Sequence, residues 1–167
     1  MVKSKSRSAA GGAANAAAVA ARLGGEIHAA GFVGDDEQGR KLLEILLAQG
    51  VKLSHAPIRD LHTATKTRYL AGSLGTSYQQ VLRVDQPLRC DADKWDAVEK
   101  ILVDTLHLLA PNLKGVLVSD YGSGETHDLL VQVAQKADAL GLPILVDSRY
   151  GIEDYALDNA VLKPNAV

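Results

Sequence analysis

The sequence contains one cysteine, no excess of either charge and no long apolar run. The single thiol, Cys90, cannot form an intramolecular disulfide and has no His/Cys cluster beside it, which argues against a disulfide scaffold and a metal site and favours the reducing cytoplasm. With a net charge of -2, the chain has no basic field to attract nucleic acid or an anionic membrane. Apolar runs such as Ile45–Ala48 are far shorter than the ~20 residues that cross a bilayer. We therefore expect no nucleic-acid partner and no membrane span.

What the sequence does contain is typical of one globular domain. It has 167 residues, of which 47% are hydrophobic and 23% are charged, and this is enough to bury a core. The first residues alternate Lys or Arg with Ser and lack the apolar segment of a signal peptide. We expect residues 1–10 to be a leader that is disordered or foreign to the domain, and residues 11–167 to form a single domain.

Helical periodicity alternates with short, wholly apolar segments along the chain. A strand that is apolar throughout is buried above and below, as in a parallel sheet covered by helices on both faces. We therefore predict an α/β fold of three layers, α/β/α, around a mostly parallel sheet. Helices are predicted at residues 13–23, 37–49, a long stretch after Asp91 and 125–140, and strands at residues 27–33, 115–119, 144–146 and 161–162.

A β-hairpin stands apart from this pattern. Residues 65–71 and 79–85 are rich in Thr, Tyr, Val and Leu, and a Gly- and Ser-containing stretch separates them. This arrangement is typical of two antiparallel strands with a flexible tip. Their alternation of polar and apolar residues indicates one solvated face. We place the hairpin, at about residues 63–86, as a lid beside the main sheet.

Polar side chains follow four of the predicted strands at the point where each strand ends. Because ligands bind at the carboxyl ends of parallel strands, these side chains would line one rim of the sheet and could bind hydroxyls, a phosphate or a metal. The alternative is that each one merely caps the next helix or turn. The four residues are Asp35, Asp120, Asp147 and Asn165.

A second group, Gly11-Gly12-Ala-Ala-Asn15, opens the first predicted helix. Paired glycines let a ligand approach the backbone closely, and the Asn15 amide offers a donor and an acceptor to adjacent sugar hydroxyls. A tight turn without a ligand is the alternative explanation. The group has neither the GxGxxG spacing of a dinucleotide loop nor the GK[ST] of a P-loop.

Three early segments stand in order: Gly11-Gly-Ala-Ala-Asn15, Ala21-Arg-Leu-Gly24 and Gly31-Phe-Val-Gly-Asp-Asp-Glu-Gln-Gly39-Arg40. Together they resemble the first signature region of the ribokinase-like (PfkB) carbohydrate kinases, and the resemblance continues to the end of the chain. Four later segments most resemble the heptose-7-phosphate kinase branch, whose members supply activated heptose for lipopolysaccharide-type glycans. These segments are Thr65–Arg68, Gln79–Asp85, Ser119–Gly122 and Val146–Arg149.

The resemblance implies a reaction. The family transfers the γ-phosphate of ATP, with Mg²⁺, to a sugar hydroxyl, and in the heptose branch this hydroxyl is the anomeric one. Such chemistry depends on positioning and charge neutralisation. The resemblance places Gly11, Gly12 and Asn15 at the sugar hydroxyls and makes the hairpin a lid that closes over the sugar.

The resemblance also implies roles for residues farther along the chain. Lys66 and Arg68 would bind the phosphate already on the sugar, although cations on a hairpin can also simply be solvated. Asp120 would face the sugar pocket. Asn165, which begins the family's Pro-Asn-x-x-Glu motif, and Asp147 would lie near the phosphates and magnesium of the nucleotide.

The sequence departs from the family pattern in three places. Ser123 stands where heptose kinases usually carry Lys, so the substrate could be another sugar, such as a ribose, a fructose or a nucleoside. The family's first strand and Asp-bearing loop precede the glycine pair, where this chain has only residues 1–10. The sequence ends at Val167, before the family's Gly-Ala-Gly-Asp loop with its anion hole and general base. No catalytic residue is therefore assigned on this chain.

An incomplete ribokinase-like fold is expected from these departures. We hypothesise that this polypeptide alone does not phosphorylate sugar. Missing strands would leave an unpaired sheet edge and exposed apolar surface, which favour a homo-oligomer or aggregation. The rival interpretation is a non-catalytic module that binds sugar or serves in assembly.

Overall fold

The structure, a computed structural model, describes residues 5–72, 77–121 and 125–164. No helix in these ranges is both long and apolar enough to cross a bilayer. The helices are α1 (Gly12–Arg22), α2 (Glu37–Ala48), α3 (Trp95–Leu109) and α4 (Glu125–Ala139), with short 3₁₀ turns η1 (Ala92–Lys94), η2 (Ala110–Asn112) and η3 (Ile152–Tyr155). The strands are β1 (His28–Ala29), β2 (Lys52–Leu53), β3 (Thr65–Ala71), β4 (Gln79–Gln86), β5 (Val116–Asp120), β6 (Ile144–Ser148) and β7 (Ala160–Lys163).

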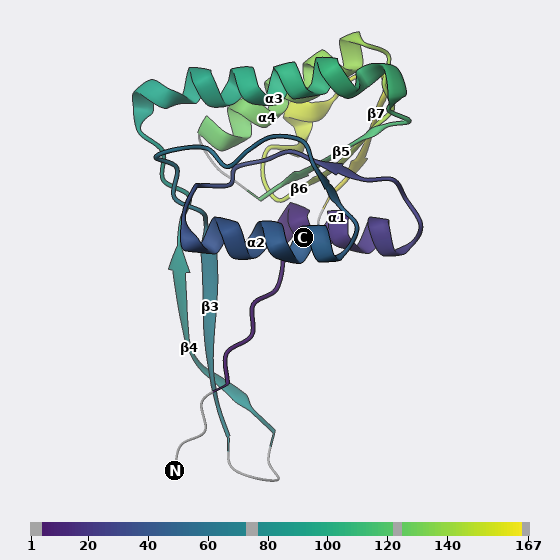
Figure 1. The fold of residues 1–167 in the computed structure, drawn as a ribbon. Helices are drawn as coiled ribbons and strands as arrows, with labels where there is room; N and C mark the ends of the chain where they lie inside the picture. Colours follow the sequence, from purple (N-terminus) through teal and green to yellow (C-terminus); the bar gives the residue numbers. More distant parts are fainter. Residues whose placement is uncertain (1–4, 73–76, 122–124, 165–167) are drawn as a thin grey trace.

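The central sheet consists of β5, β6 and β7, in that order and all parallel. Helices α3 and α4 lie on one face of this sheet, and α1 and α2 lie on the other (Figure 1). This arrangement confirms the predicted α/β fold with helices on both sides of a parallel sheet. The sheet is small for such a fold, as expected for an incomplete ribokinase-like architecture.

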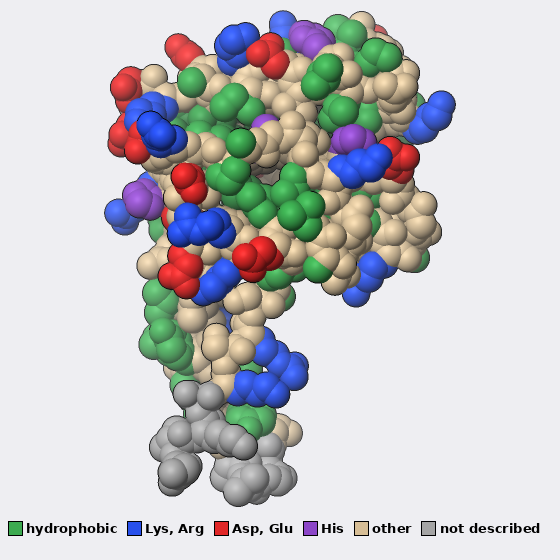
Figure 2. Space-filling model, viewed as in Figure 1, with side chains coloured by type: hydrophobic (Ala, Val, Ile, Leu, Met, Phe, Trp, Pro, Cys, Tyr) green, Lys and Arg blue, Asp and Glu red, His purple; other side chains and the backbone are tan. Residues whose placement is uncertain are grey.

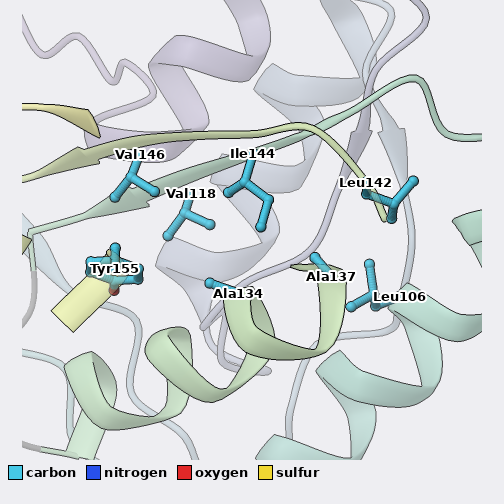
Figure 3. Close-up of a cluster of buried hydrophobic side chains, with 8 residues drawn as sticks. All are labelled: Leu106, Val118, Ala134, Ala137, Leu142, Ile144, Val146 and Tyr155. Atoms are coloured by element: carbon cyan, nitrogen blue, oxygen red, sulfur yellow. The ribbon is translucent and has the colours of Figure 1, made fainter. Parts of the chain in front are cut away.

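The main core lies between the central sheet and α4. Val118, Ile144 and Val146 extend from β5 and β6 toward Ala134 and Ala137 of α4 (Figure 3), and each of the five is at most 4% exposed. The alanines let the helix approach the strands closely, while the branched side chains fill the space between them. Burial of each of the larger side chains contributes about 1.5–3 kcal/mol.

The opposite face of the same strands carries an exposed apolar row. Leu117, Leu145 and Val161 are aligned in register across β5, β6 and β7, and they are 46%, 44% and 65% exposed. Successive residues of a strand point to opposite faces, so this row lies away from α4. The exposed apolar surface that the sequence led us to expect is present at this sheet face.

The strand predicted at residues 27–33 is much shorter in the structure. Only β1 pairs, with the equally short β2, in a separate parallel sheet. Beyond it, Gly31 N–H donates to His55 Nε2 at 3.0 Å instead of to a neighbouring strand, and Gly34 forms an isolated bridge with Ile58. Asp35 therefore does not end a strand of the central sheet, and its carboxylate pairs with Arg40 at 3.2 Å.

The predicted hairpin is present as β3 and β4, which pair antiparallel with one irregularity between Tyr69 and Leu70. It projects away from the layered body (Figure 1), and almost every residue in it is exposed. The sequence indicated one solvated face, whereas both faces are solvated here, since the described residues of both strands are exposed except Thr65. Hydrophobic side chains are visible on it (Figure 2).

Candidate functional site

A close backbone crossing anchors the root of the hairpin to α2. Gly34 N–H donates to Thr63 Oγ1 at 2.9 Å, and the Asp36 carboxylate accepts from Gly39 N–H at 2.7 Å and from Thr63 N–H at 2.8 Å. Burial alone would raise the pKa of Asp36, but these hydrogen bonds outweigh it and lower the pKa below its ordinary value. The glycine-rich signature segment thus fixes where the hairpin leaves the body.

The glycine pair lies at the beginning of α1, as the sequence predicts. Gly11 is the N-cap residue, and Gly12 has a φ of 49°, a conformation that favours glycine. Among the described residues, apart from the chain neighbours and the helix backbone, no atom lies within 4 Å of a Cβ built at either position, and Asn15 is exposed. The described residues therefore leave room for a ligand at this end of α1, which packs against β5.

Asp120, at the end of β5, is 1% exposed. One oxygen of its carboxylate, Oδ2, accepts a hydrogen bond from Tyr155 Oη at 2.9 Å and lies 2.6 Å from His127 Nδ1. Ser148 Oγ lies 3.4 Å from the same oxygen, and its single proton is donated to the Tyr150 carbonyl at 2.5 Å. The carboxylate is thus enclosed among side chains of α4, β6 and η3.

Asp147, near the end of β6, lies in a second and more open cluster. Its carboxylate accepts from Lys163 Nζ at 2.8 Å and from Tyr121 Oη at 2.9 Å. The hydrogen bond from Lys163 outweighs the opposing effect of burial and, with that from Tyr121, lowers the pKa of Asp147 below its ordinary value. This carboxylate is therefore ionised at neutral pH, and a cation and a phenol lie beside it at the rim.

The two carboxylates share the rim but not the face of the sheet. The register pairs Ser119 with Asp147 and Asp120 with Ser148, and successive strand residues face opposite sides. Asp120 lies two residues after Val118, which packs in the core on the α4 side, so it faces α4 as well. Helix α1 lies on the other face of the sheet (Figure 1), which is the face of Asp147. We expected the polar side chains at the strand ends to line one rim together, and the structure differs for Asp120. Asp147 lies on the same side of the sheet as α1 and Asn15, whereas the Asp120 carboxylate lies on the opposite side.

Lys66 and Arg68 lie on one face of the projecting hairpin, and both are exposed. Across the ladder, Lys66 pairs with Asp85 and Arg68 with Arg83, and Arg83 forms an ion pair with Asp85. Arg83 therefore neutralises the carboxylate on this face and lowers the pKa of Asp85. The two predicted phosphate ligands are exposed, on a face of the hairpin that also carries a third cation.

Sequence reasoning missed the residues that surround the rim carboxylates. His127, Tyr155 and Lys163 come from α4, η3 and β7, and no local motif distinguishes them from ordinary helix and strand residues. Two predicted features, Asn165 and the Ser123 position, lie outside the described residues. Within the described ranges, no group of three His, Cys, Asp or Glu side chains is arranged to hold a metal ion.

Comparisons with known proteins assign the family. Residues 2–166 match the pfkB family carbohydrate kinase. Bifunctional protein HldE of Vibrio parahaemolyticus is 31% identical over 156 residues, which cover 93% of this chain and 30% of the relative. The proteins of the same name from Hyphomonas neptunium and Magnetococcus marinus are 36% and 33% identical, over 98% and 87% of this chain and 32% and 29% of their own lengths.

This chain thus spans about a third of the length of these curated relatives. The match covers nearly all of the chain, including the glycine pair and both rim carboxylates. It confirms the resemblance that the sequence motifs indicated. The chain belongs to the pfkB family of carbohydrate kinases.

Proposed function

We propose that this chain supplies the sugar-binding part of an ATP-dependent kinase that phosphorylates a sugar or sugar phosphate, in particular a heptose 7-phosphate at its anomeric hydroxyl. The observation that carries the proposal is the family match along almost the whole chain, together with the open glycine pair at the start of α1. The similarity to proteins named HldE and the heptose-kinase-like segments favour heptose over other sugars. The reaction uses ATP and Mg²⁺ and belongs in the cytoplasm, as a step toward lipopolysaccharide-type glycans.

We propose the residue roles that the family resemblance implies. Gly11 and Gly12 let the sugar approach the start of α1, and Asn15 exchanges hydrogen bonds with its hydroxyls. Lys66 and Arg68 on the lid bind the phosphate of the sugar, for which Arg offers a bidentate contact.

Three further residues act at the ends of β5, β6 and β7. Asp147 lies with Lys163 at the rim where the nucleotide phosphates would bind. For Asn165, which is outside the described residues, we propose a contact with the same phosphates, as the family resemblance implies. Asp120, enclosed by its donors, shapes the sugar pocket by holding the end of β5.

The same geometry argues against a complete reaction by this chain alone. A general base must be able to take the proton of the sugar hydroxyl. Among the described rim residues, the Asp120 carboxylate is buried and bonded to Tyr155, and the Asp147 carboxylate is engaged by Lys163 and Tyr121. We therefore infer binding without turnover.

Calorimetric titration of the purified chain with heptose 7-phosphate, ribose and fructose 6-phosphate tests the proposal. We expect heptose 7-phosphate to bind most tightly, and we expect Asn15→Ala to weaken binding about tenfold, the effect of losing one or two hydrogen bonds. Gln38→Ala, which removes an exposed amide from α2, is the matched control. Equal heats for all sugars, or none, would contradict the proposed substrate, and ATP consumption with sugar would contradict the inference of no turnover.

We propose secondly that the chain forms a homo-oligomer. Self-association is also compatible with the alternative interpretation of the chain as a non-catalytic assembly module. Thr67, Tyr69, Leu82 and Val84 lie on one side of the hairpin ladder, opposite Lys66 and Arg68. We call these four residues the hairpin apolar face; Tyr69 is 52% exposed and Leu82 is 54% exposed. A solvated apolar face on a projecting hairpin favours pairing with a second copy.

Leu82→Glu should weaken this self-association at least tenfold, because it places a charge where two apolar faces would meet. Sedimentation velocity over a range of concentrations measures the effect. Gln80→Glu introduces the same charge on the other side of the ladder and should leave association unchanged. A wild-type chain that sediments as a monomer at high concentration would refute the proposal.

A further inference from the structure

His127 bridges two elements beneath the rim. Its side chain, in the first turns of α4, is 13% exposed. Nδ1 lies 2.6 Å from Asp120 Oδ2 at the end of β5, and Nε2 lies 2.9 Å from Asp154 Oδ2 in η3. One imidazole therefore joins the strand end, the helix and the turn that follows β6.

The bridge requires a protonated ring. A neutral imidazole has one donor and one acceptor, so only the imidazolium can donate to both carboxylates. Burial by itself would lower the pKa of His127, but the hydrogen bonds and charges of Asp154 and Asp120 outweigh it and raise the pKa above its ordinary value of 6.5. Asp128, the next residue of α4, also carries a charge and lines the same groove as His127 and Asp154.

Tyr155 and Gly151 both pack closely against the His127 ring. Tyr155 meets it edge to face, with ring centroids 5.6 Å apart, and burial and its bond to Asp120 raise the pKa of Tyr155, so that its hydroxyl stays a neutral donor. Gly151 has a φ of 55°, and a Cβ there would lie 2.8 Å from both His127 Nε2 and Asp154 Oδ2. The turn before η3 can cover His127 only because position 151 is glycine.

The bridge and the rim share the same strand ends. Asp120 and Ser148 face His127, while their chain neighbours Tyr121 and Asp147 form the rim cluster. The Asp120 carbonyl also accepts from Arg149 N–H at 2.9 Å. A shift of Asp120 is therefore transmitted directly to Tyr121 and to the end of β6.

We propose that His127 is a positioning residue whose protonated ring clamps Asp120 to Asp154 and so holds the rim at the ends of β5 and β6 in its binding geometry. The inference rests on the proposed sugar kinase function only for the identity of the ligand. The clamp itself is a property of the unliganded chain.

The sign of the pH effect follows from the direction of the pKa shift. Because the pKa of His127 is higher in the folded chain than in the unfolded one, the clamp stabilises the fold fully at pH values below the ordinary His pKa. The stabilisation is lost as the pH rises through the raised pKa. Above that pH one ring nitrogen would face a carboxylate as an acceptor, and the clamp opens.

NMR titration of the histidine rings in the whole chain tests the clamp without any ligand. We expect the His127 resonances to titrate above the ordinary histidine value of 6.5, and Asp154→Asn to move the His127 midpoint downward toward that value. Urea unfolding from about pH 6 to about pH 9 should show a loss of stability in the wild type that is absent in His127→Gln. His107→Gln, a replacement on the surface of α3, should retain the wild-type pH dependence.

The ligand arm uses heptose 7-phosphate at the same pH values. The affinity of the wild type for this sugar should fall about tenfold from about pH 6 to about pH 9, and that of His127→Gln should fall less. Ionisation of the sugar phosphate affects both proteins equally, so it does not contribute to the difference between them. A His127 midpoint that Asp154→Asn leaves unchanged overturns the clamp whether or not sugar binds. Failure of every variant to bind sugar, with the midpoint shifted as expected, counts against the proposed function and not against the clamp.

Discussion

Gly39→Ala is expected to destabilise the folded chain by about 3 kcal/mol or more, the upper range for atoms forced into a packed crossing. A Cβ at Gly39 would lie 2.0 Å from the Gly34 carbonyl oxygen, and one at Gly34 would lie 1.9 Å from the Leu61 carbonyl oxygen. Both obstacles are backbone atoms, held by the bonds that Asp36 and Thr63 make, so they cannot rotate away as a flexible side chain could.

Whether Gly39→Ala raises or lowers the stability shows which of two effects dominates, the steric clash at the backbone crossing or the helix propensity of alanine. Gly39 lies within α2, where replacement of glycine by alanine would by itself stabilise a helix by about 1 kcal/mol. Urea unfolding of Gly39→Ala and Gly34→Ala measures the net change. Gly31→Ala is the control, because no atom lies within 4 Å of its Cβ and its φ is not positive. A Gly39→Ala chain as stable as the wild type would show that no close crossing exists.

Asp120→Ala is expected to cost about 3–5 kcal/mol, the usual loss when one partner of a buried charge pair is removed. The substitution leaves the His127 ring and the Tyr155 hydroxyl without the oxygen that they share. Asp120→Asn should cost less, because an amide oxygen can still accept from Tyr155, although it cannot balance the charge of the imidazolium. Thermal or urea unfolding at about pH 6, where His127 is protonated, gives the largest difference.

Asp147→Ala provides the comparison for this second prediction. Asp147 lies near the end of the neighbouring strand, one register position away, but its partners Lys163 and Tyr121 are exposed. Pairs of that kind contribute about 0–1 kcal/mol, so the substitution should have little effect on unfolding. Similar losses from Asp120→Ala and Asp147→Ala would contradict the view that only one of the two carboxylates is structural.

Much of the fold could be predicted from local sequence patterns. The leucine-rich stretch from residue 37, capped by Asp36, and the apolar runs before Asp120 and Asp147 became the expected helix and strands. The predicted strand at 27–33 was too long because Gly31 bonds to His55, and Val33 and Asp35 bond to Ile58, about 24 positions onward, instead of to an adjacent strand. Contacts of that range leave no periodic signal in the sequence.

The sequence by itself determined the family, the helices, the parallel strands and the presence of two carboxylates at strand ends, because each depends on a periodicity or a motif in contiguous residues. Only the tertiary structure decided that Asp120 faces α4 while Asp147 faces the side of α1, and that His127 joins Asp120 to Asp154. Alternation puts neighbouring strand residues on opposite faces, but which helix covers each face is fixed only by packing between elements far apart in the sequence. The partners of these residues also lie on other elements, 7 to 35 positions away along the chain, and only folding brings them together.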